Sequence, residues 1–292
     1  MKILVTGATG FIGTRLIPRL VEEGHDVICV ARSAREKPAL AGAHRWLVLD
    51  LAALQVPPES VKADAVIYLA QSRRYREFPD QARDILAVNA NAVLTMLDWA
   101  RSCGVRSFVY ASSANVYGAG PEPLVESAPM APASFYGQTK QIGEMLVGSY
   151  AEFLECTTLR LFTVYGHGQA GTLIPSLVDR IRKGDPIQLQ GADGLRLSPV
   201  VVDEAAYFLA KAIELRSEGR AAVFNLGGPE GLNLRQLSQQ IGQAVGREPV
   251  FNELRGPEPG GWLADLSALR EAFGSVPQVR FRDGIRQAIT AP

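Results

Sequence analysis

The sequence contains little cysteine and histidine, and neither residue forms a metal-binding or disulfide pattern. Cys29, Cys103 and Cys156 are an odd number of cysteines, far apart and each within an apolar stretch. They favour buried thiols in a reducing compartment over a disulfide framework or a zinc site. The three histidines are equally scattered, so we expect no metal site.

The chain also lacks an excess of either charge and any long hydrophobic run. Its 292 residues include 30 Lys and Arg against 30 Asp and Glu, and 47% are hydrophobic. This balance argues against disorder and against a general partner among nucleic acids or acidic membranes. No stretch approaches about 18 consecutive apolar residues, and Met1–Gly7 lacks the apolar region of a signal peptide. We therefore expect a cytoplasmic globular protein with no nucleic-acid or membrane partner.

The first half alternates short apolar runs with longer helical patterns, which is typical of β-α-β units and a parallel sheet. Most of the runs are continuously apolar, as expected of strands covered on both faces. The expected strands are Lys2–Thr6, Asp26–Ala31, Arg45–Leu49, Ala65–Ala70, Ser107–Ser112 and Thr157–Phe162. The expected helices are Gly13–Glu23, Pro79–Cys103 and Phe135–Phe153.

A glycine-rich loop joins the first expected strand to the first expected helix. Gly7, Gly10 and Gly13 allow a tight turn and a close approach of backbone to a pyrophosphate, and the helix N-terminus offers free N–H groups to it. Phe11 and Ile12, between the last two glycines, are expected to line the same cofactor. Glycine turns are also common without a ligand, but the strand before and the helix after this loop favour a dinucleotide site.

The elements together predict the fold class α/β, with a Rossmann-like, doubly wound parallel sheet and a smaller C-terminal α/β domain. After Gly166 the glycines and prolines become more frequent and the apolar runs shorter. We expect a dinucleotide-binding domain at residues 1–165 and a substrate-binding domain at 166–292. Part of residues 196–226 is expected to return to the first domain.

The second strand ends without the acidic residue that commonly holds the adenosine ribose of NAD. Arg32 stands close to that place, with Arg35 close behind. An arginine can neutralise a 2′-phosphate, and the missing carboxylate removes a repulsion against it. Arg32 therefore favours NADP over NAD, while a solvated surface cation is the alternative interpretation.

Tyr136 and Lys140 are four residues apart, which places a phenol and an ammonium on one face of a helix. A nearby cation favours the phenolate, so the pair suits general acid/base chemistry. Ser113 lies near the carboxyl end of a buried strand, where open α/β sheets bind their ligands. A Tyr-x-x-x-Lys pair alone is usually without function, but the glycine loop and the serine upstream favour a catalytic site.

With these motifs the chain resembles the extended short-chain dehydrogenase/reductase family, which contains nucleotide-sugar epimerases, dehydratases and reductases. The resemblance covers almost the whole chain and further includes Tyr68–Ala70, Val88-Asn89, Leu159–Phe162, Val164–Gly166 and Asn225–Gly228. It implies that Asp50 and Leu51 hold the adenine and that Leu69, Ala70 and Asn89 line the cofactor.

The resemblance also implies roles for the three candidate catalytic residues. Ser113 would polarise the substrate, and Tyr136 would transfer the proton. Lys140 would hold the nicotinamide ribose and lower the pKa of Tyr136.

Ala114 and Asn115 differ from the residues that other members of this family carry after the serine. Members that remove water resemble Asp-Glu there, decarboxylases keep a Glu, and 3,5-epimerases use a Cys. Neither Ala114 nor Asn115 supplies such a proton-transfer group. The resemblance therefore implies simple hydride transfer at one carbon, as in 4-epimerases and 4-keto reductases.

Arg196 and Arg255 match two family arginines, and two guanidinium groups suit a substrate pyrophosphate. Thr163 stands where many epimerases have an Asn that contacts the diphosphate, and we assign it to the substrate site as well. Gln71 replaces a small residue that lines the cofactor, and Leu197 replaces an acidic residue. These departures leave the substrate more open than the fold or the hydride chemistry.

The expected function is hydride transfer between NADP or NAD and C4 of a nucleotide-activated sugar, without a 4,6-dehydratase activity. A reductase of a non-sugar carbonyl compound and a non-catalytic dinucleotide sensor on the same fold are the alternatives.

The resemblance also implies a homodimer through Pro79–Cys103 and Phe135–Phe153. The apolar residues expected at that interface are Leu86, Val93, Leu97, Ile142 and Leu146, which could equally pack against the sheet.

Overall fold

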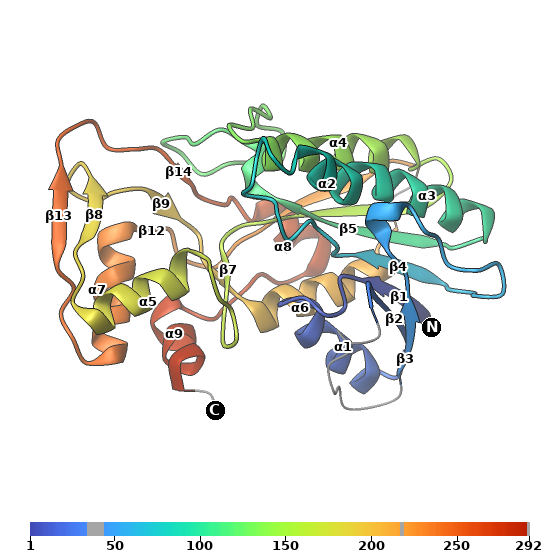
Figure 1. Ribbon diagram of the computed structural model, residues 1–292, viewed down its shortest axis with the longest axis horizontal. Coiled ribbons are helices and arrows are strands. Elements are labelled where there is room, and N and C mark those ends of the chain that lie inside the picture. The colour runs from blue at the N-terminus through green and yellow to red at the C-terminus, as the bar shows by residue number, and fades with distance from the viewer. Residues whose placement is uncertain (34–43, 217–218, 291–292) are drawn as a thin grey trace. The chain divides into compact units, whose positions relative to one another are not determined.

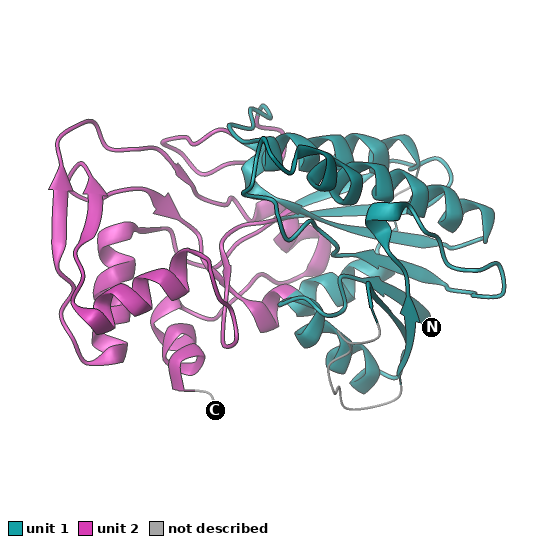
Figure 2. Ribbon diagram, viewed as in Figure 1, with its two compact units in different colours: residues 1–117, 129–160, 206–224 teal, residues 118–128, 161–205, 225–292 magenta. Residues whose placement is uncertain are grey.

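The computed structural model describes residues 1–33, 44–216 and 219–290 (Figure 1). The chain forms two compact units (Figure 2). Unit 1 comprises Met1–Tyr117, Pro129–Arg160 and Ala206–Phe224, and unit 2 comprises Gly118–Ala128, Leu161–Ala205 and Asn225–Pro292.

The boundaries of the units differ in detail from the division expected at residue 165. Residues 118–128 belong to unit 2, where Gly120 forms a β-bridge with Gly261 and Leu124 with Ala264. Residues 206–224 belong to unit 1, within the range expected to return to it. Pairing with distant residues decides both assignments, and no composition change in the sequence marks them.

Unit 1 is built on a seven-stranded sheet in the order β11-β6-β5-β4-β1-β2-β3. The pairs β1/β2, β1/β4, β2/β3 and β4/β5 are parallel. The strands are β1 (Lys2–Thr6), β2 (Asp26–Ala31), β3 (His44–Val48), β4 (Ala65–Tyr68), β5 (Ser107–Ser113), β6 (Glu155–Leu161) and β11 (Ala222–Leu226). This arrangement confirms the predicted Rossmann-like α/β fold.

Helices cover both faces of this sheet, with α2, α3 and α4 on one face and α1 and α6 on the other (Figure 1). They are α1 (Gly13–Glu22), α2 (Ala82–Leu86), α3 (Ala92–Ser102), α4 (Phe135–Ser149) and α6 (Val202–Lys211). Shorter helical turns are η2 (Leu51–Ala53), η4 (Ala114–Val116) and η5 (Ala212–Glu214). Because both faces are covered, Ile3, Leu4 and Val5 of β1 are all completely buried.

Most of the expected helices and strands are present, but several begin or end at residues other than those expected. β1 and β2 begin and end as expected, while β3 lies one residue earlier and β4 ends at Tyr68. The helix expected at Pro79–Cys103 begins at Ala82 and contains η3 (Ala87–Asn91), a π-helical turn, between α2 and α3. The helix expected to reach Phe153 ends at Ser149, with Tyr150 as its C-cap.

Unit 2 contains short strands in small sheets and several helices. The strands are β7 (Val164–Tyr165), β8 (Ile187–Gln190), β9 (Arg196–Leu197), β10 (Val200–Val201), β12 (Leu232–Asn233), β13 (Phe251–Leu254) and β14 (Gly261–Trp262). The helices are α5 (Leu173–Lys183), α7 (Leu234–Val245), α8 (Ser267–Phe273) and α9 (Phe281–Thr290). Its apolar core includes Leu177, Leu189, Leu237 and Phe281.

Within the described ranges, no helix is long and apolar enough to cross a membrane. The same residues contain no group of three or more His, Cys, Asp or Glu side chains placed to hold a metal ion. Cys29 and Cys156 are buried and Cys103 is partly buried, and all three are free thiols. Burial raises the pKa of the Cys29 thiol to about 12, which keeps it protonated.

Candidate active site

The carboxyl ends of three neighbouring strands of unit 1 lie side by side. The parallel register places Thr6 of β1 beside Tyr68 of β4, and Tyr68 beside Tyr110 of β5. The loops that follow these strands therefore meet at one edge of the sheet, where α/β folds bind their ligands. The glycine loop, the segment after β4 and Ser113 all lie on this edge.

The glycine loop packs directly against the segment that follows β4. Gly7 has a φ of +67°, and a Cβ there would lie 2.9 Å from the backbone nitrogen of Ala70 and from the carbonyl carbon of Leu69. The Ala70 N–H donates to the Thr6 hydroxyl at 3.2 Å. The structure thus brings together Gly7, Leu69 and Ala70, which the sequence analysis assigned to one cofactor site.

The start of α1 suits a bound phosphate. A Cβ at Gly13 would lie 2.4 Å from the carbonyl oxygen of Gly7, so the helix can begin this close to the loop only with glycine. Its N-cap residue Ile12 forms no side-chain capping hydrogen bond, and the first turn contains no acidic residue. A helix N-terminus without a compensating acidic residue attracts an anion, so these residues fit the pyrophosphate of a dinucleotide.

The other predicted cofactor residues lie at the ends of β2 and β3. Arg32 is exposed directly after β2, and Arg35 lies outside the described residues. The Asp50 carboxylate accepts a hydrogen bond from the Ala52 N–H at 3.0 Å and caps the turn η2. Leu51 is buried in the core of unit 1.

Asn89 is completely buried in the π-helical turn η3. Its side-chain carbonyl accepts from the Ser72 N–H at 2.9 Å, and its amide donates to the Thr139 hydroxyl at 3.1 Å. Asn89 therefore connects the segment after β4 to α4. The π-helical turn changes the direction of the side chain relative to a continuous α-helix, and such turns are frequent at functional sites.

Ser113, Tyr136 and Lys140 come together in unit 1. Ser113 ends β5 and caps η4, while Tyr136 and Lys140 lie in the first two turns of α4. A side-chain hydrogen bond joins Ser113 and Tyr136. Gly137 permits this approach, because a Cβ there would lie 2.2 Å from the carbonyl oxygen of Asn115.

The Tyr136 phenol is partly buried, and burial raises its pKa to about 12. The hydrogen bond with Ser113 acts in the opposite direction, because it stabilises the phenolate. Tyr75 raises the pKa of Tyr136 further, and the two rings lie 5.0 Å apart between centroids. In this state Tyr136 carries its proton, as a general acid requires.

The Lys140 ammonium is almost completely buried beneath this pair. Its Nζ donates to the Ala111 carbonyl at 2.7 Å and lies 4.9 Å from the centroid of the Tyr110 ring. Burial lowers the pKa of Lys140 to about 7, and the Glu144 carboxylate one turn further along α4 opposes this shift. The site therefore holds a lysine whose proton is released near neutral pH.

A buried ion pair that the sequence analysis did not identify supports this part of α4. The Arg160 guanidinium donates to both Glu144 carboxylate oxygens, with Nη2 to Oε2 at 2.7 Å and Nε to Oε1 at 3.0 Å. The Ser112 hydroxyl also donates to Glu144, and Arg160 contacts the Tyr117 hydroxyl. The sequence offered no local signal for this pair, because Glu144 and Arg160 lie 16 positions apart on different elements.

Gln71 is a further residue of the site whose contact with Tyr136 the sequence analysis did not predict. The Tyr136 hydroxyl donates to the Gln71 side-chain carbonyl at 3.1 Å. The sequence showed only that Gln71 replaces a smaller residue. The contact joins residues 65 positions apart, so no local pattern could have predicted it.

The predicted substrate residues lie in unit 2. Arg196 is on β9, which pairs with β12 and β14, and its guanidinium donates to the Pro121 carbonyl. Arg255 is exposed directly after β13, which belongs to a different sheet with β8. Thr163 is partly buried, and its carbonyl accepts from the Val200 N–H at 3.0 Å.

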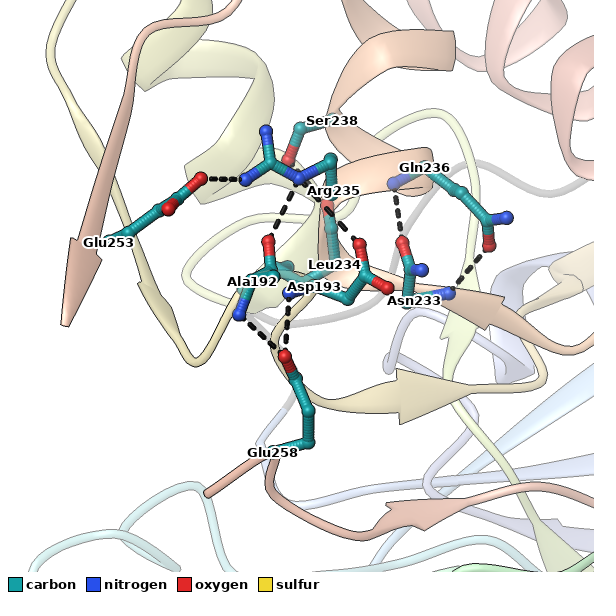
Figure 3. Close-up of polar contacts among 9 residues, drawn as sticks. All are labelled: Ala192, Asp193, Asn233, Leu234, Arg235, Gln236, Ser238, Glu253 and Glu258. Carbon is teal, nitrogen blue, oxygen red and sulfur yellow. Dashed lines mark hydrogen bonds and ion pairs between the residues drawn. The ribbon is translucent and has the colours of Figure 1, made fainter. Parts of the chain in front are cut away.

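Arg235, another arginine of unit 2, is held in a polar cluster (Figure 3). Its Nε donates to the Ala192 carbonyl at 2.9 Å, and its Nη2 pairs with the Glu253 carboxylate. Glu258 accepts from the N–H groups of Ala192 and Asp193. These contacts fix the loop after β8.

Unit 2 also contains a cavity of about 300 Å³. Its lining includes Ser198, Gly228, Asp265 and Arg270. Gly228 belongs to the Asn225–Gly228 motif, and a Cβ there would lie 1.9 Å from the Pro199 carbonyl oxygen. The motif glycine therefore allows two loops of unit 2 to pack closely beside this cavity.

The fold, and the Ser-Tyr-Lys grouping at the same sheet edge as the glycine loop, define a dinucleotide-dependent α/β oxidoreductase or epimerase. The sequence profile of the NAD dependent epimerase/dehydratase family matches residues 3–227. The chain belongs to this family.

Three similar proteins illustrate the relationship. A UDP-glucose 4-epimerase of Mycolicibacterium smegmatis is 29% identical over 311 residues, which cover 99% of this chain and 97% of the relative. A probable UDP-glucuronate 4-epimerase of Rhizobium meliloti is 25% identical over 328 residues, covering 99% and 96%. The solved structure of MoeE5 in complex with UDP-glucose and NAD has a TM-score of 0.84 and 26% identity, covering 99% and 97%.

Proposed function

We propose that this protein is an NAD(P)-dependent enzyme that transfers hydride at C4 of a nucleotide-activated sugar, as a 4-epimerase or a 4-keto reductase. The grouping of Ser113, Tyr136 and Lys140 at the carboxyl end of β5 carries this proposal. The similar proteins are UDP-glucose and UDP-glucuronate 4-epimerases, and UDP-sugars are therefore the substrates to test first.

Each catalytic side chain has a separate task. Tyr136 gives its proton to, or takes one from, the C4 oxygen, and the hydrogen bond from Ser113 stabilises the phenolate formed when the proton leaves. Lys140 supplies a positive charge when it is protonated, and this also favours the phenolate. A bound nicotinamide dinucleotide would accept or supply the hydride. The residues that would hold it are the glycine loop, Phe11, Ile12, Asp50, Leu51, Leu69, Ala70, Asn89 and Lys140.

Ala114 and Asn115 limit the reaction. Removal of water or epimerisation at two further carbons needs another acid or base beside Tyr136. Ala114 has no ionisable group, and the Asn115 amide is neutral and donates to Ser113. A single proton-transfer group is enough for hydride transfer at one carbon.

For substrate binding, we propose that Arg196 and Arg255 pair with the diphosphate and that Thr163 lines the same site. Guanidinium groups match phosphate geometry and charge.

We also propose a homodimer formed by α3 and α4. Leu94, Ile142 and Met145 leave 39%, 40% and 62% of their surfaces exposed on these helices. Val93 and Leu97, expected at the interface, are instead fully buried in the core of unit 1.

The proposal is tested by replacing the acid/base residue. Tyr136→Phe keeps the ring and removes the hydroxyl, so kcat for UDP-glucose epimerisation should fall about 100-fold or more. NAD affinity, measured by calorimetry, should remain within about threefold of the wild-type value. Tyr207→Phe, a partly buried tyrosine on α6, is the matched control and should keep full activity.

Other outcomes separate the alternatives. Tight dinucleotide binding without turnover of any UDP-sugar or keto compound by the wild type would favour a non-catalytic sensor. Turnover of simple carbonyl compounds but of no nucleotide sugar would favour the non-sugar reductase.

The cofactor preference is tested with the purified protein. We propose NADP over NAD because Arg32 stands exposed where an acidic residue would hold the ribose of NAD. Arg32→Ala should then weaken NADPH binding about tenfold and leave NADH binding unchanged, since one charge-assisted contact is lost. Stoichiometric NAD released from the denatured wild type would overturn this preference and indicate a self-recycling epimerase.

A further inference from the structure

Two polar side chains flank the Ser113–Tyr136 pair from opposite ends. Asn115 donates to the Ser113 hydroxyl oxygen twice, from its backbone N–H at 3.2 Å and from its side-chain amide at 3.0 Å. The Tyr136 hydroxyl donates to the side-chain carbonyl of Gln71 at 3.1 Å. The Ser113 side chain in turn interacts with the Tyr136 phenol and lowers its pKa, so the four side chains follow one another within unit 1.

The donors and acceptors of this chain determine its direction. A serine hydroxyl has one hydrogen and two lone pairs, and Asn115 occupies both lone pairs. The remaining hydrogen of Ser113 is therefore free to point to the Tyr136 oxygen. Tyr136 has one hydrogen, which it gives to Gln71. Each hydrogen bond thus runs from Asn115 through Ser113 and Tyr136 to Gln71.

The segment that carries Gln71 is anchored in the structure. The adjacent Ser72 is buried, and its N–H donates to Asn89 at 2.9 Å. The Ser72 hydroxyl donates to Asp84 and accepts from the Arg74 N–H at 3.1 Å. The Tyr75 ring lies against that of Tyr136. These contacts hold the backbone at Gln71 in place, although the Gln71 side chain is itself exposed.

We propose that Gln71 and Asn115 are positioning residues that set the protonation of Tyr136 in opposite directions. An acceptor facing the phenol stabilises the protonated form, whereas a donor stabilises the phenolate. Gln71 holds the phenol proton at rest and yields it to the substrate oxygen, while Asn115 keeps Ser113 oriented as a donor. This inference rests on the proposed function, because it assigns Tyr136 the acid/base role.

The test is a titration of the Tyr136 phenol in the protein saturated with NAD. Absorbance near 295 nm is followed from about pH 8 to pH 12.5 after rapid pH jumps, and the curve of the same protein with Tyr136→Phe is subtracted. Gln71→Ala should lower the pKa of Tyr136 and Asn115→Ala should raise it, each by about 0.5 to 1. Asn115→Ser, which restores a short donor, should return the value toward wild type.

Gln138→Ala is the matched control, since Gln138 is an exposed glutamine on α4 two residues from Tyr136. It should leave the titration unchanged. Shifts of the same sign in Gln71→Ala and Asn115→Ala, or no shift in Gln71→Ala, would overturn the proposal. Circular dichroism identifies a variant that fails to fold, and Asn115→Ser then replaces Asn115→Ala with a smaller expected rise.

The titration needs no turnover, so its outcome is independent of the substrate. If the opposite shifts occur and no UDP-sugar is converted, the positioning roles stand and the proposed function fails. If UDP-glucose is converted, the acidic limb of the kcat profile should move in the same direction as the titration in each variant.

Discussion

Lys140 illustrates at the scale of one residue how burial changes chemistry. Among the described residues its ammonium donates to one acceptor, the Ala111 carbonyl, and an aromatic face lies beside it. The nearest carboxylate on its helix, Glu144, is already paired with Arg160. Removal from water therefore dominates, and the pKa of Lys140 falls to about 7. The folded protein consequently loses a charge near neutral pH that the unfolded chain keeps.

This shift makes stability depend on pH. Below about pH 7 Lys140 is protonated in both states, so folding includes the full cost of burying the charge. From about pH 7 to 10.5 the unfolded chain binds the proton and the folded protein does not, so stability rises with pH. Lys140→Met should therefore raise the Tm of the cofactor-free protein most below about pH 7, and less as pH rises.

Tm values from differential scanning fluorimetry at about pH 6, 7.5 and 9 check this expectation. Lys183→Met, which removes an exposed lysine of α5, is the control. A Tm difference between wild type and Lys140→Met that stays constant over this range would contradict the argument.

At the scale of one element, the glycines of α4 determine how closely the helix approaches β5. A Cβ at Gly143 would lie 2.2 Å from the Tyr110 hydroxyl oxygen and 2.7 Å from its ring. That hydroxyl is buried without a hydrogen-bond partner among the described residues. The helix therefore packs on a tyrosine that only glycine accommodates.

Gly143→Ala should lower the free energy of unfolding by about 1–3 kcal/mol, because the added methyl group overpacks the core. Tyr110→Phe removes the nearest atom and should recover part of that loss in the double variant. Gly148→Ala is the control on the same helix, since a Cβ there meets nothing within 4 Å. It should be neutral or stabilising, because alanine favours helix. Urea unfolding gives the free energy of unfolding of the wild type, Gly143→Ala, Gly148→Ala and the double variant. Equal losses in Gly143→Ala and Gly148→Ala would refute the packing argument.

The helices and strands also show how much of the secondary structure the sequence periodicity can predict. The runs Lys2–Thr6 and Asp26–Ala31 form strands at the predicted residues, because uninterrupted apolar residues bounded by polar ones leave little choice of boundary. The helix predicted at Pro79–Cys103 is less regular, since η3 interrupts the α-helical hydrogen bonds at Ala87–Asn91. Periodicity cannot show such a turn, because the apolar spacing on either side remains helical.

At the scale of the whole molecule, the proposed homodimer would cover the exposed apolar residues of α3 and α4. Leu94, Ile142 and Met145 lie on neighbouring helices, and a large apolar surface is typical of an interface. Met145→Glu should convert a dimer into a monomer in sedimentation velocity at about 10 µM, because it buries a charge in the interface. Val250→Glu, an exposed apolar residue of unit 2, should leave the mass unchanged. A monomeric wild type would end the dimer proposal.

The fold class, the glycine loop and the placement of Tyr136 and Lys140 on one helix face followed from the sequence alone. These depend on short-range patterns: apolar runs, glycine spacing, and the four-residue interval between Tyr136 and Lys140. Helix and strand geometry convert such intervals into shared faces without any knowledge of distant residues. The family resemblance extended these predictions from single motifs to the order of the helices and strands.

Tertiary packing set which distant side chains meet. Gln71 reaches Tyr136 across 65 positions, and Arg196 reaches Pro121 across 75. The register of β4 beside β5 places the ends of two separate loops at one sheet edge, and β-bridges with Gly261 and Ala264 draw residues 118–128 into unit 2. Such contacts depend on the packing of several elements at once, and no local interval in the sequence encodes them.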